Sequence, residues 1–144
     1  MLVSDVTNAG LIPALEKAMA FTEARNRVLA ENIANVTTPG YQAKQLDVSA
    51  FQAALKEASR QREANGGEFK LPSSEQFRTD EEGMLAVTPG EEPVENLLFQ
   101  DGTNARIERQ MALLAENTMM NQAVSNLLRA RFDGLETAIR GRVR

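Results

Sequence analysis

The sequence predicts a mainly α-helical chain whose long N-terminal and C-terminal helices pair as an elongated, coiled-coil-like hairpin. Apolar residues recur at steps of three and four near both ends, whereas six of the nine Gly and three of the five Pro lie between residues 40 and 102. The middle is therefore expected to be irregular, with a short helix and short β-strands. This divides the 144 residues into an N-terminal helix over 1–39, a central region over 40–102 and a C-terminal helix over 103–144.

The first helix is predicted from Pro13 to Ala34. Pro suits a first turn, where its missing N–H is no loss. The helix should end at Thr38-Pro39-Gly40, because the residue before Pro is driven to extended geometry and Pro-Gly suits the centre of a type II turn. One face carries a stripe of apolar residues in which Thr22 is the polar position. The apolar members are Leu11, Leu15, Ala18, Met19, Leu29 and Ile33.

The second helix, roughly residues 105 to 140, carries the strongest pattern in the chain. At a rise of about 1.5 Å per residue it would be roughly 50 Å long, which favours a coiled coil within or between chains. The main stripe is Ile107, Met111, Leu114, Thr118, Asn121, Ser125, Leu128, Phe132, Leu135 and Ile139, and a neighbouring stripe is Leu113, Met120, Val124 and Leu127. Two apolar stripes call for more than one neighbour. Asn117 and Asn121 could fix the register of a coiled coil or turn to solvent, and both interpretations remain open.

The central region should contain a helix that starts with a capping box over Ser49 to Gln52 and stops before Asn65-Gly66-Gly67. Two short extended segments are predicted, over residues 68–71 and 84–88. The acidic and Pro-rich residues 89–96 favour a loop. A turn over residues 101–104 should lead into the second helix, with Asn104 as its N-cap.

The composition excludes several kinds of chemistry. The chain has no Cys, His or Trp, so it can form no disulfide, no thiolate or imidazole metal site and no catalytic triad that contains His. The paired acids at residues 80–82 and 91–92 lie in loop composition with nothing apolar to enclose a substrate. We therefore predict no catalytic residue, no cofactor and no metal. A carboxylate enzyme would gain support only from a pocket that encloses two acids.

Charge and apolar content point to assembly. Leu, Ile, Val and Phe make up only 34 of the 144 residues, so one compact core would be thinly supplied and apolar surface is expected to meet other chains. Residues 40–100 carry 6 basic and 11 acidic groups, and residues 101–144 carry 7 and 5. The C-terminal segment lacks the interleaved aromatics of a nucleic-acid binder. No run resembles a membrane span or a cleavable secretion signal.

A specific motif ends the first helix. The segment from Leu29 to Tyr41 reads Leu-Ala-Glu-Asn-Ile-Ala-Asn-Val-Thr-Thr-Pro-Gly-Tyr. It resembles the N-terminal block of the flagellar axial proteins, the family of rod, hook and hook-junction subunits, which reads approximately Leu-Ala-x-Asn-Ile-Ala-Asn-x-Asn-Thr-Pro-Gly-Tyr. Thr37 departs from the usual Asn, which bears on the turn geometry. The matching motif residues are Asn32, Ile33, Ala34, Asn35, Thr38, Pro39, Gly40 and Tyr41.

Length and the C-terminal block narrow the resemblance to proximal rod subunits. At 144 residues the chain is too short for hook, distal-rod or filament-junction subunits. The runs Leu-Phe-Gln-Asp-Gly-Thr-Asn at 98–104 and Arg-Gln-Met-Ala-Leu-Leu-Ala-Glu-Asn at 109–117 are similar to proximal rod subunits. An Ala-Ser-Arg-x-Tyr-Glu stretch, expected in another short rod protein, is missing. The resemblance covers roughly residues 11–56 and 97–140, and residues 57–96 match no known pattern.

The resemblance implies a structural subunit of the proximal rod of the bacterial flagellar basal body, whose terminal axial helices line a hollow export channel used for motility. It implies self-association and contacts with other rod proteins, the rod-to-MS-ring adaptor and the MS ring. A soluble helical adaptor or export chaperone is the alternative. The residues expected at the assembly interface are Leu15, Leu29, Ile33, Ile107, Met111, Leu114, Met120, Val124, Leu127, Leu128, Phe132, Leu135 and Ile139.

The family also implies a route out of the cell. Its members pass through the flagellar type III export machine to the periplasmic rod without a cleaved signal. The export gate recognises early substrates through a short element of the form Phe-x-x-x-hydrophobic. Phe51 and Leu55 have that spacing. They could serve the gate or simply pack on one face of the short helix, and both interpretations remain open.

Overall fold

A computed structural model describes residues 11–93 and 102–141. Three helices account for most of them. They are α2 (Leu11–Ala34), α3 (Val48–Asn65) and α4 (Gly102–Gly141), and the short strands are β1 (Lys44–Gln45), β2 (Phe77–Thr79), β3 (Leu85–Val87) and β4 (Gly90–Glu91). The mainly helical fold class predicted from the sequence is confirmed.

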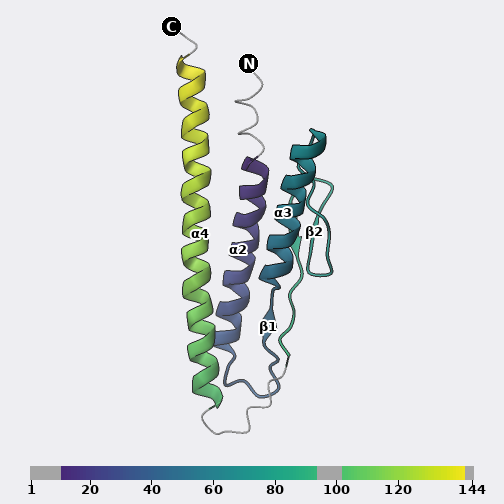
Figure 1. The fold of residues 1–144 in the computed structure, drawn as a ribbon. Coiled ribbons are helices and arrows are strands. Elements are labelled where there is room, and N and C mark those ends of the chain that lie inside the picture. Colours follow the sequence, from purple (N-terminus) through teal and green to yellow (C-terminus); the bar gives the residue numbers. More distant parts are fainter. Residues whose placement is uncertain (1–10, 94–101, 142–144) are drawn as a thin grey trace.

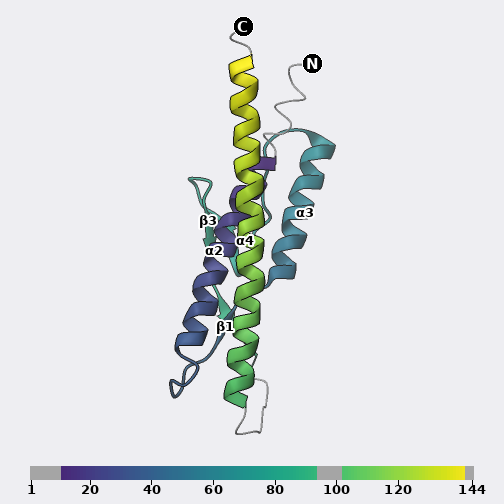
Figure 2. The ribbon, with the colours of Figure 1, turned by 90° about the vertical axis from the view of Figure 1, so that its left-hand side faces the viewer.

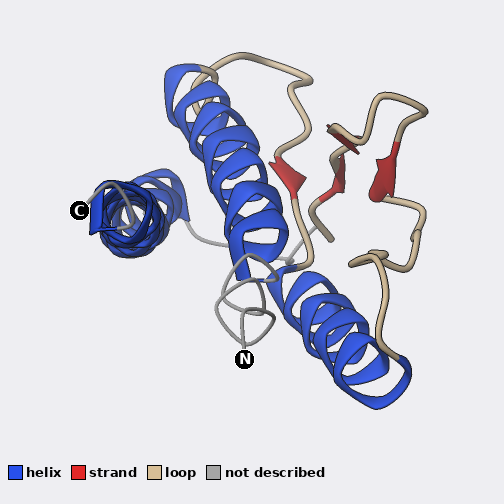
Figure 3. Cartoon of the chain, turned by 90° about the horizontal axis from the view of Figure 1, so that it is seen from above, coloured by secondary structure: helices blue, strands red, loops and turns tan. Residues whose placement is uncertain are grey.

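Helix α2 is the centre of the fold. Viewed from above, it has α4 on one side and α3 with the strands on the other (Figure 3). Its sequence supplies a face for each side, because Leu15, Thr22 and Leu29 are buried at heptad spacing and a second buried row contains Phe21 and Val28. A helix with two buried faces needs two neighbours, and both come from the same chain.

Helices α2 and α4 form an antiparallel pair along the length of α2 (Figures 1 and 2). The direction is fixed by hydrogen bonds, since Asn32 contacts Gln110 whereas Met19 contacts Asn121. The α2 helix has 24 residues and α4 has 40. Leu11 lies eight positions before Met19, so α4 continues roughly twelve residues, or about 18 Å, past the first described residue of α2.

Helix α3 begins two residues earlier than the predicted capping box. Asp47 is its N-cap, because the Asp47 carboxylate accepts from Ala50 N at 2.9 Å and from Ser49 Oγ at 2.9 Å. Those two hydrogen bonds stabilise the charged form and hold the pKa of Asp47 below its usual range. The Ser49 N-cap prediction was wrong, since Ser49 serves Asp47 instead of the helix end. The predicted stop before Asn65 was one residue too early, since α3 includes Asn65 and has Gly66 as its C-cap.

The strands form two small antiparallel ladders, β1 with β4 and β2 with β3. Strand β3 lies inside the predicted segment 84–88, but residues 68–71 are not a strand, and Gly90–Glu91 pairs where a loop was expected. Strands this short are not specified by alternation alone. The tip of the β2–β3 hairpin is held to α2 by Lys17 Nζ, which donates to Gly83 O.

Three Phe rings form the centre of the core between α2, α3 and the β2–β3 hairpin. Phe21 and Phe51 stack with ring centroids 3.9 Å apart, and Phe77 meets Phe51 edge to face at 5.3 Å. Ala24, Val28, Leu46 and Leu71 complete this buried cluster. The core is small, as the supply of large side chains suggested, and it lies on the side of α2 away from α4.

The turn after α2 has the predicted type II character. Tyr41 N donates to Thr38 O at 3.2 Å, which closes a four-residue turn around Pro39 and Gly40. The φ of Gly40 is +76°, the value that such a turn requires at its third position. Thr37, the departure from the family pattern, is exposed outside this turn.

Two Gly→Ala substitutions, one in this turn and one in α4, test whether Gly40 needs its positive φ. Gly40→Ala is expected to cost about 1 kcal/mol, because a Cβ there meets no other atom and only the positive φ is penalised. Gly134→Ala, in an open position of α4, is expected to stabilise by up to about 1 kcal/mol through helix propensity. Urea unfolding of the two variants should show these opposite signs. Equal shifts would contradict the assignment of the turn.

Helix α4 starts at Gly102, so Asn104 lies inside the helix and the predicted N-cap there was wrong. Gly102 to Asn104 are helical, and Asp101 of the predicted turn lies outside the described residues. Within residues 11–93 and 102–141, no helix combines the length and the hydropathy that a bilayer crossing requires.

Candidate functional site

The face of α4 that packs on α2 is centred on polar residues. Its buried positions are Gln110, Asn117 and Val124, spaced seven apart. The predicted stripe placed Met111 at this seam, but the Met111 side chain is 55% exposed. The stripe is therefore rotated by about one residue from its predicted place, and the seam keeps the heptad spacing with amides where apolar residues were expected.

Asn117 is the most deeply buried large side chain, with 1% of its surface exposed. Its Nδ2 donates to Thr22 O and to Asn26 Oδ1, both at 2.8 Å. One turn further along, Asn121 Nδ2 donates to Thr22 Oγ1 at 2.8 Å. Of the two open interpretations of Asn117 and Asn121, the contacts with α2 favour the register device, because a slip of α4 would leave buried amides without partners.

The family motif forms a second polar contact, which we call the Asn32 clasp, made of Asn32, Tyr41, Lys44 and Gln110. Asn32 is 3% exposed. Its Nδ2 donates to Lys44 O at 2.7 Å and to Gln110 Oε1 at 3.1 Å. Its Oδ1 accepts from Lys44 N at 2.9 Å and from Tyr41 Oη at 3.0 Å. One carboxamide thus joins the end of α2, the strand β1 and the start of α4, with all its usual hydrogen-bonding positions used.

Glu92 and Arg109 extend the hydrogen-bond network of the clasp. Gln110 Nε2 donates to Glu92 Oε2 at 3.1 Å, and Glu92 also contacts Arg109 at 3.2 Å, so the residues that follow β4 are tied to α4. Burial and the nearby Glu31 carboxylate raise the pKa of Tyr41. The Tyr41 hydroxyl therefore stays protonated near neutral pH and remains a donor to Asn32.

The other motif residues lie around the turn and contact solvent more. Asn35 Nδ2 donates to Glu31 O at 2.9 Å, and Thr38 N donates to Asn35 O at 2.9 Å. Ile33 is half-buried, and Ala34, Thr38, Pro39 and Gly40 are exposed. The motif thus combines one buried clasp residue, Asn32, with a surface turn that reverses the chain from α2 into β1.

The residues predicted at an assembly interface fall into a covered set and an exposed set. In the covered set, the chain itself buries all or part of the apolar surface. Its buried members are Leu15, Leu29 and Val124, and its half-buried members are Ile33, Ile107, Leu114, Leu128 and Leu135. The exposed set consists of Met111, Met120, Leu127, Phe132 and Ile139, with 42% to 68% of each side chain exposed. Only this second set offers large apolar surface to another molecule.

Phe51 and Leu55, the candidate export-gate pair, lie on the inner face of α3. Phe51 is buried between Phe21 and Phe77, and Leu55 packs against the same cluster. In the folded chain, therefore, Phe51 and Leu55 both pack against the core, as the packing interpretation predicts. Recognition by an export gate stays a prediction, and it would require α3 to leave the core.

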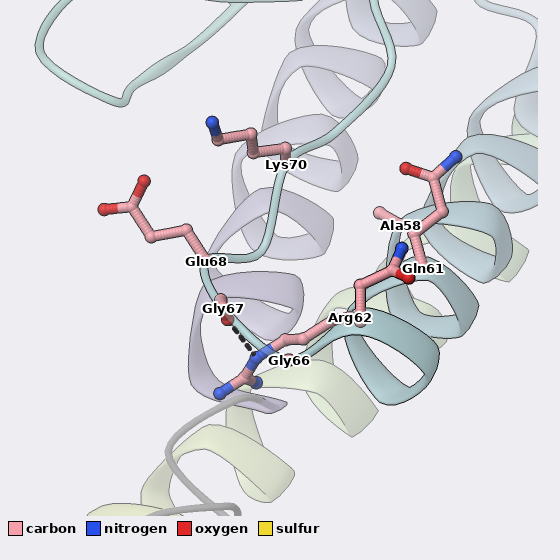
Figure 4. A pocket seen from close by; sticks show the side chains of 8 residues that line it. Ala58, Gln61, Arg62, Gly66, Gly67, Glu68 and Lys70 are labelled. Carbon is pink, nitrogen blue, oxygen red and sulfur yellow. Dashed lines mark hydrogen bonds between the residues drawn. The ribbon is translucent and has the colours of Figure 1, made fainter.

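Two hollows lie among the described residues. One, at the end of α3, has a volume of about 360 Å³. In it Arg62 Nε donates to Gly67 O at 3.1 Å, while Glu68 and Lys70 extend from the loop (Figure 4). The other lies between the three helices and includes Glu116. Neither encloses two carboxylates, and no acidic cluster of metal-ligating size occurs among the described residues.

Sequence reasoning missed the roles of Gln110 and Asn32, because polar side chains in an amphipathic helix are ordinarily assigned to the solvent face. A usable signal was present, since Gln110, Asn117 and Val124 are seven apart, as are Leu15, Thr22 and Leu29. A heptad pattern read without regard to polarity thus contains Gln110, whereas Asn32 lies outside both rows.

The chain is similar over most of its length to bacterial proteins named "Flagellar basal body rod protein FlgB". The protein from Cereibacter sphaeroides (strain ATCC 17029 / ATH 2.4.9) is 32% identical over 87% of this chain and 90% of that protein. The protein from Salmonella typhimurium is 30% identical over 88% and 90%, and that from Bacillus subtilis is 28% identical over 92% and 95%. No protein-family model matches the chain.

Proposed function

The chain belongs to the FlgB family of flagellar basal body rod proteins, and from this premise we propose how it works as a structural subunit of the proximal rod. The proposal is that the antiparallel pair of α2 and α4 is rigid and runs along the rod, and that its exposed apolar residues contact neighbouring subunits. The adaptor and chaperone alternative has no support among the relatives, all of which carry the name of a rod protein.

The observation that carries the proposal is the contrast between the α2-facing side of α4 and the rest of its surface. The α2-facing side is locked to α2 by buried amides, while Met111, Met120, Leu127, Phe132 and Ile139 are exposed elsewhere along the helix. Several large apolar side chains exposed along one long helix are typical of an interaction surface. The buried amides hold the two helices in one register, so this surface has one fixed shape.

The finer parts of the function are proposals on the same basis. Residues 1–39 and 103–144 serve as axial segments, and 40–102 lie away from the rod axis. The partners are other copies and other rod proteins, the rod-to-MS-ring adaptor and the MS ring, within the periplasmic part of the basal body. The chain reaches this place through the flagellar type III export machine without a cleaved signal, and the gate reads Phe51 and Leu55 before the core forms.

A complementation experiment tests the structural role. In a motile bacterium that lacks its own copy of this subunit, the full chain should restore swimming, and a chain without residues 129–144 should not. A chain with Met120→Ser and Leu127→Ser should fold but assemble poorly, because both side chains are exposed on α4.

The matched control is Met84→Ser, which removes a more exposed Met from the hairpin and should leave swimming unchanged. Swim-plate diameter and the rod content of purified basal bodies are the measurements. Full swimming by the truncated chain would contradict the proposal that α4 carries the assembly contacts.

A further inference from the structure

A single Asn-Gly dipeptide lies at the end of α3. Of the ten Asn residues in the chain, Asn65 alone is followed by Gly. In this dipeptide the backbone nitrogen of Gly can attack the side-chain carbonyl carbon of Asn, because Gly has no Cβ to crowd the approach. Asn65, Gly66 and Gly67 are all exposed to solvent. Position 65 is therefore the Asn at which loss of the side-chain amide is chemically easiest.

Deamidation at this position requires only water and base. Hydroxide removes the proton of Gly66 N, and the nitrogen forms a bond with Asn65 Cγ. The Cγ–Nδ2 bond breaks, and ammonia leaves with a proton from water, which restores the hydroxide. Water then opens the five-membered succinimide ring. Opening at Cγ gives an aspartate at position 65, and opening at the backbone carbonyl carbon gives an isoaspartyl linkage, so one amide and one water become one acid and one ammonia.

The fold keeps both reacting groups out of position. Gly66 is the C-cap of α3 and its N–H donates to Arg62 O at 2.9 Å, so the proton that must leave is engaged in a hydrogen bond. Asn65 is the last residue of α3, and a helical residue has a ψ of about −42°. Ring closure requires Gly66 N and Asn65 Cγ to lie on the same side of the Cα–C bond, which this ψ does not allow. The reaction therefore waits until the cap opens.

Arg62 holds the cap by a second hydrogen bond. Its side chain extends towards the residues that follow α3, and its Nε donates to Gly67 O at 3.1 Å (Figure 4). Gly66 has a φ of +64° and Gly67 a φ of +111°, values that Gly adopts freely among many others. The Arg62 side chain thus restrains two residues that would otherwise move easily.

We propose that Asn65 is a site of spontaneous deamidation and that the α3 cap, formed by Arg62, Gly66 and Gly67, sets its rate. The inference goes beyond the role in the rod and does not depend on it. Helix ends open locally at a free energy well below that of global unfolding. The rate in the folded chain is then the rate in the unfolded chain multiplied by the fraction of time for which the cap is open.

The reaction would loosen the end of α3 for good. An aspartate at position 65 places a carboxylate at the C-terminus of a helix, where the macrodipole disfavours negative charge. An isoaspartyl linkage adds one methylene group to the main chain before Gly66 N, which moves this nitrogen away from Arg62 O. Both products therefore weaken the hydrogen bond that closes the cap.

Peptide mapping of the unchanged full-length chain tests the proposal. The protein is incubated at mildly alkaline pH in native buffer and in urea, and a zero-time sample corrects for reaction during digestion. Trypsin cleaves after Arg62 and Lys70, so the peptide 63–70 contains Asn65 and no other Asn. In urea, mass spectrometry should show Asn65 losing its amide faster than every other Asn. In native buffer the rate should be at least about tenfold lower, equivalent to at least about 1.4 kcal/mol for opening of the cap.

A matched pair of variants tests the part that Arg62 plays. Arg62→Ala removes the bond to Gly67 O and keeps a good helix former, so it should raise the native rate about threefold or more. Arg60→Ala removes the same charge from α3, but Arg60 pairs with Glu57, away from the cap. This control should keep the native rate of the unchanged chain. Each native rate is divided by the rate of the same variant in urea, so that direct effects of charge on the chemistry cancel.

Three results would overturn the proposal. Faster reaction of another Asn in urea would refute Asn65 as the site. Equal rates in native buffer and urea, or equal ratios for Arg62→Ala and Arg60→Ala, would refute control by the cap. A native rate no higher than the urea rate multiplied by the globally unfolded fraction would refute local opening. The comparison of native buffer with urea uses no variant, so it decides the matter even if a variant fails to fold.

Discussion

Asn32→Ala is expected to lower the free energy of unfolding by about 3 kcal/mol, the largest effect expected of a polar substitution among the residues that the structure describes. The substitution removes four hydrogen bonds at once. The backbone N–H and C=O of Lys44 and the side chain of Gln110 then lose partners in a partly or fully buried place. Each such group costs roughly 1–3 kcal/mol, and entering water recovers part of that cost.

Asn35→Ala is the matched control, since it removes the other Asn of the same motif. Asn35 makes one exposed side-chain bond to Glu31 O, so its loss should cost less than about 1 kcal/mol. Urea unfolding followed by circular dichroism measures both variants. Similar losses for the two Asn residues would mean that the clasp does not hold the helices together.

Asn32→Asp should make the free energy of unfolding depend on pH. The new carboxylate would be buried and would face Lys44 O and Gln110 Oε1, so the pKa of Asp at this position rises above its unfolded value. The folded variant then binds a proton more tightly than the unfolded variant. Its destabilisation should therefore be greatest above that raised pKa and should shrink as the pH falls through it. A deficit independent of pH would count against this geometry.

Phe51→Ala is expected to cost about 3–5 kcal/mol, because it removes a buried ring that stacks on Phe21 and meets Phe77 edge to face. The result would be a chain whose α3 no longer docks on α2. Thermal unfolding followed by circular dichroism, together with the loss of near-ultraviolet signal, measures it.

The same residue lets packing be separated from export. Phe51→Ala combined with Leu55→Ala should reduce secretion by the flagellar export machine if the gate reads this pair. Phe21→Ala is the matched control, since it removes the stacking partner of Phe51 and leaves the proposed signal intact. Normal secretion of the Phe21→Ala chain with poor secretion of the double variant supports recognition. Equal secretion of both would assign Phe51 and Leu55 to packing alone.

Regular elements could be predicted where the local sequence decides them. The end of α2 at Ala34 and the Thr38–Tyr41 turn follow from Pro39 and Gly40, whose backbone preferences act without tertiary help. The two-residue strands β1 and β4 could not be predicted, because Lys44 and Glu91 pair only once α2 and α4 have brought their segments together. The Asp47 cap was also missed, since Ser49 matched a capping box equally well.

The sequence by itself determined that this protein is helical at both ends, has no residues for thiol or imidazole chemistry and carries the motif of a rod subunit. Periodicity, composition and the Pro-Gly turn are local properties, so they can be found without coordinates. Only the tertiary structure decided that Asn32, Gln110 and Asn117 occupy the α2–α4 seam. The physical reason is that a buried amide is stable only opposite a specific partner, and partners 78 and 95 positions away meet only in the folded chain.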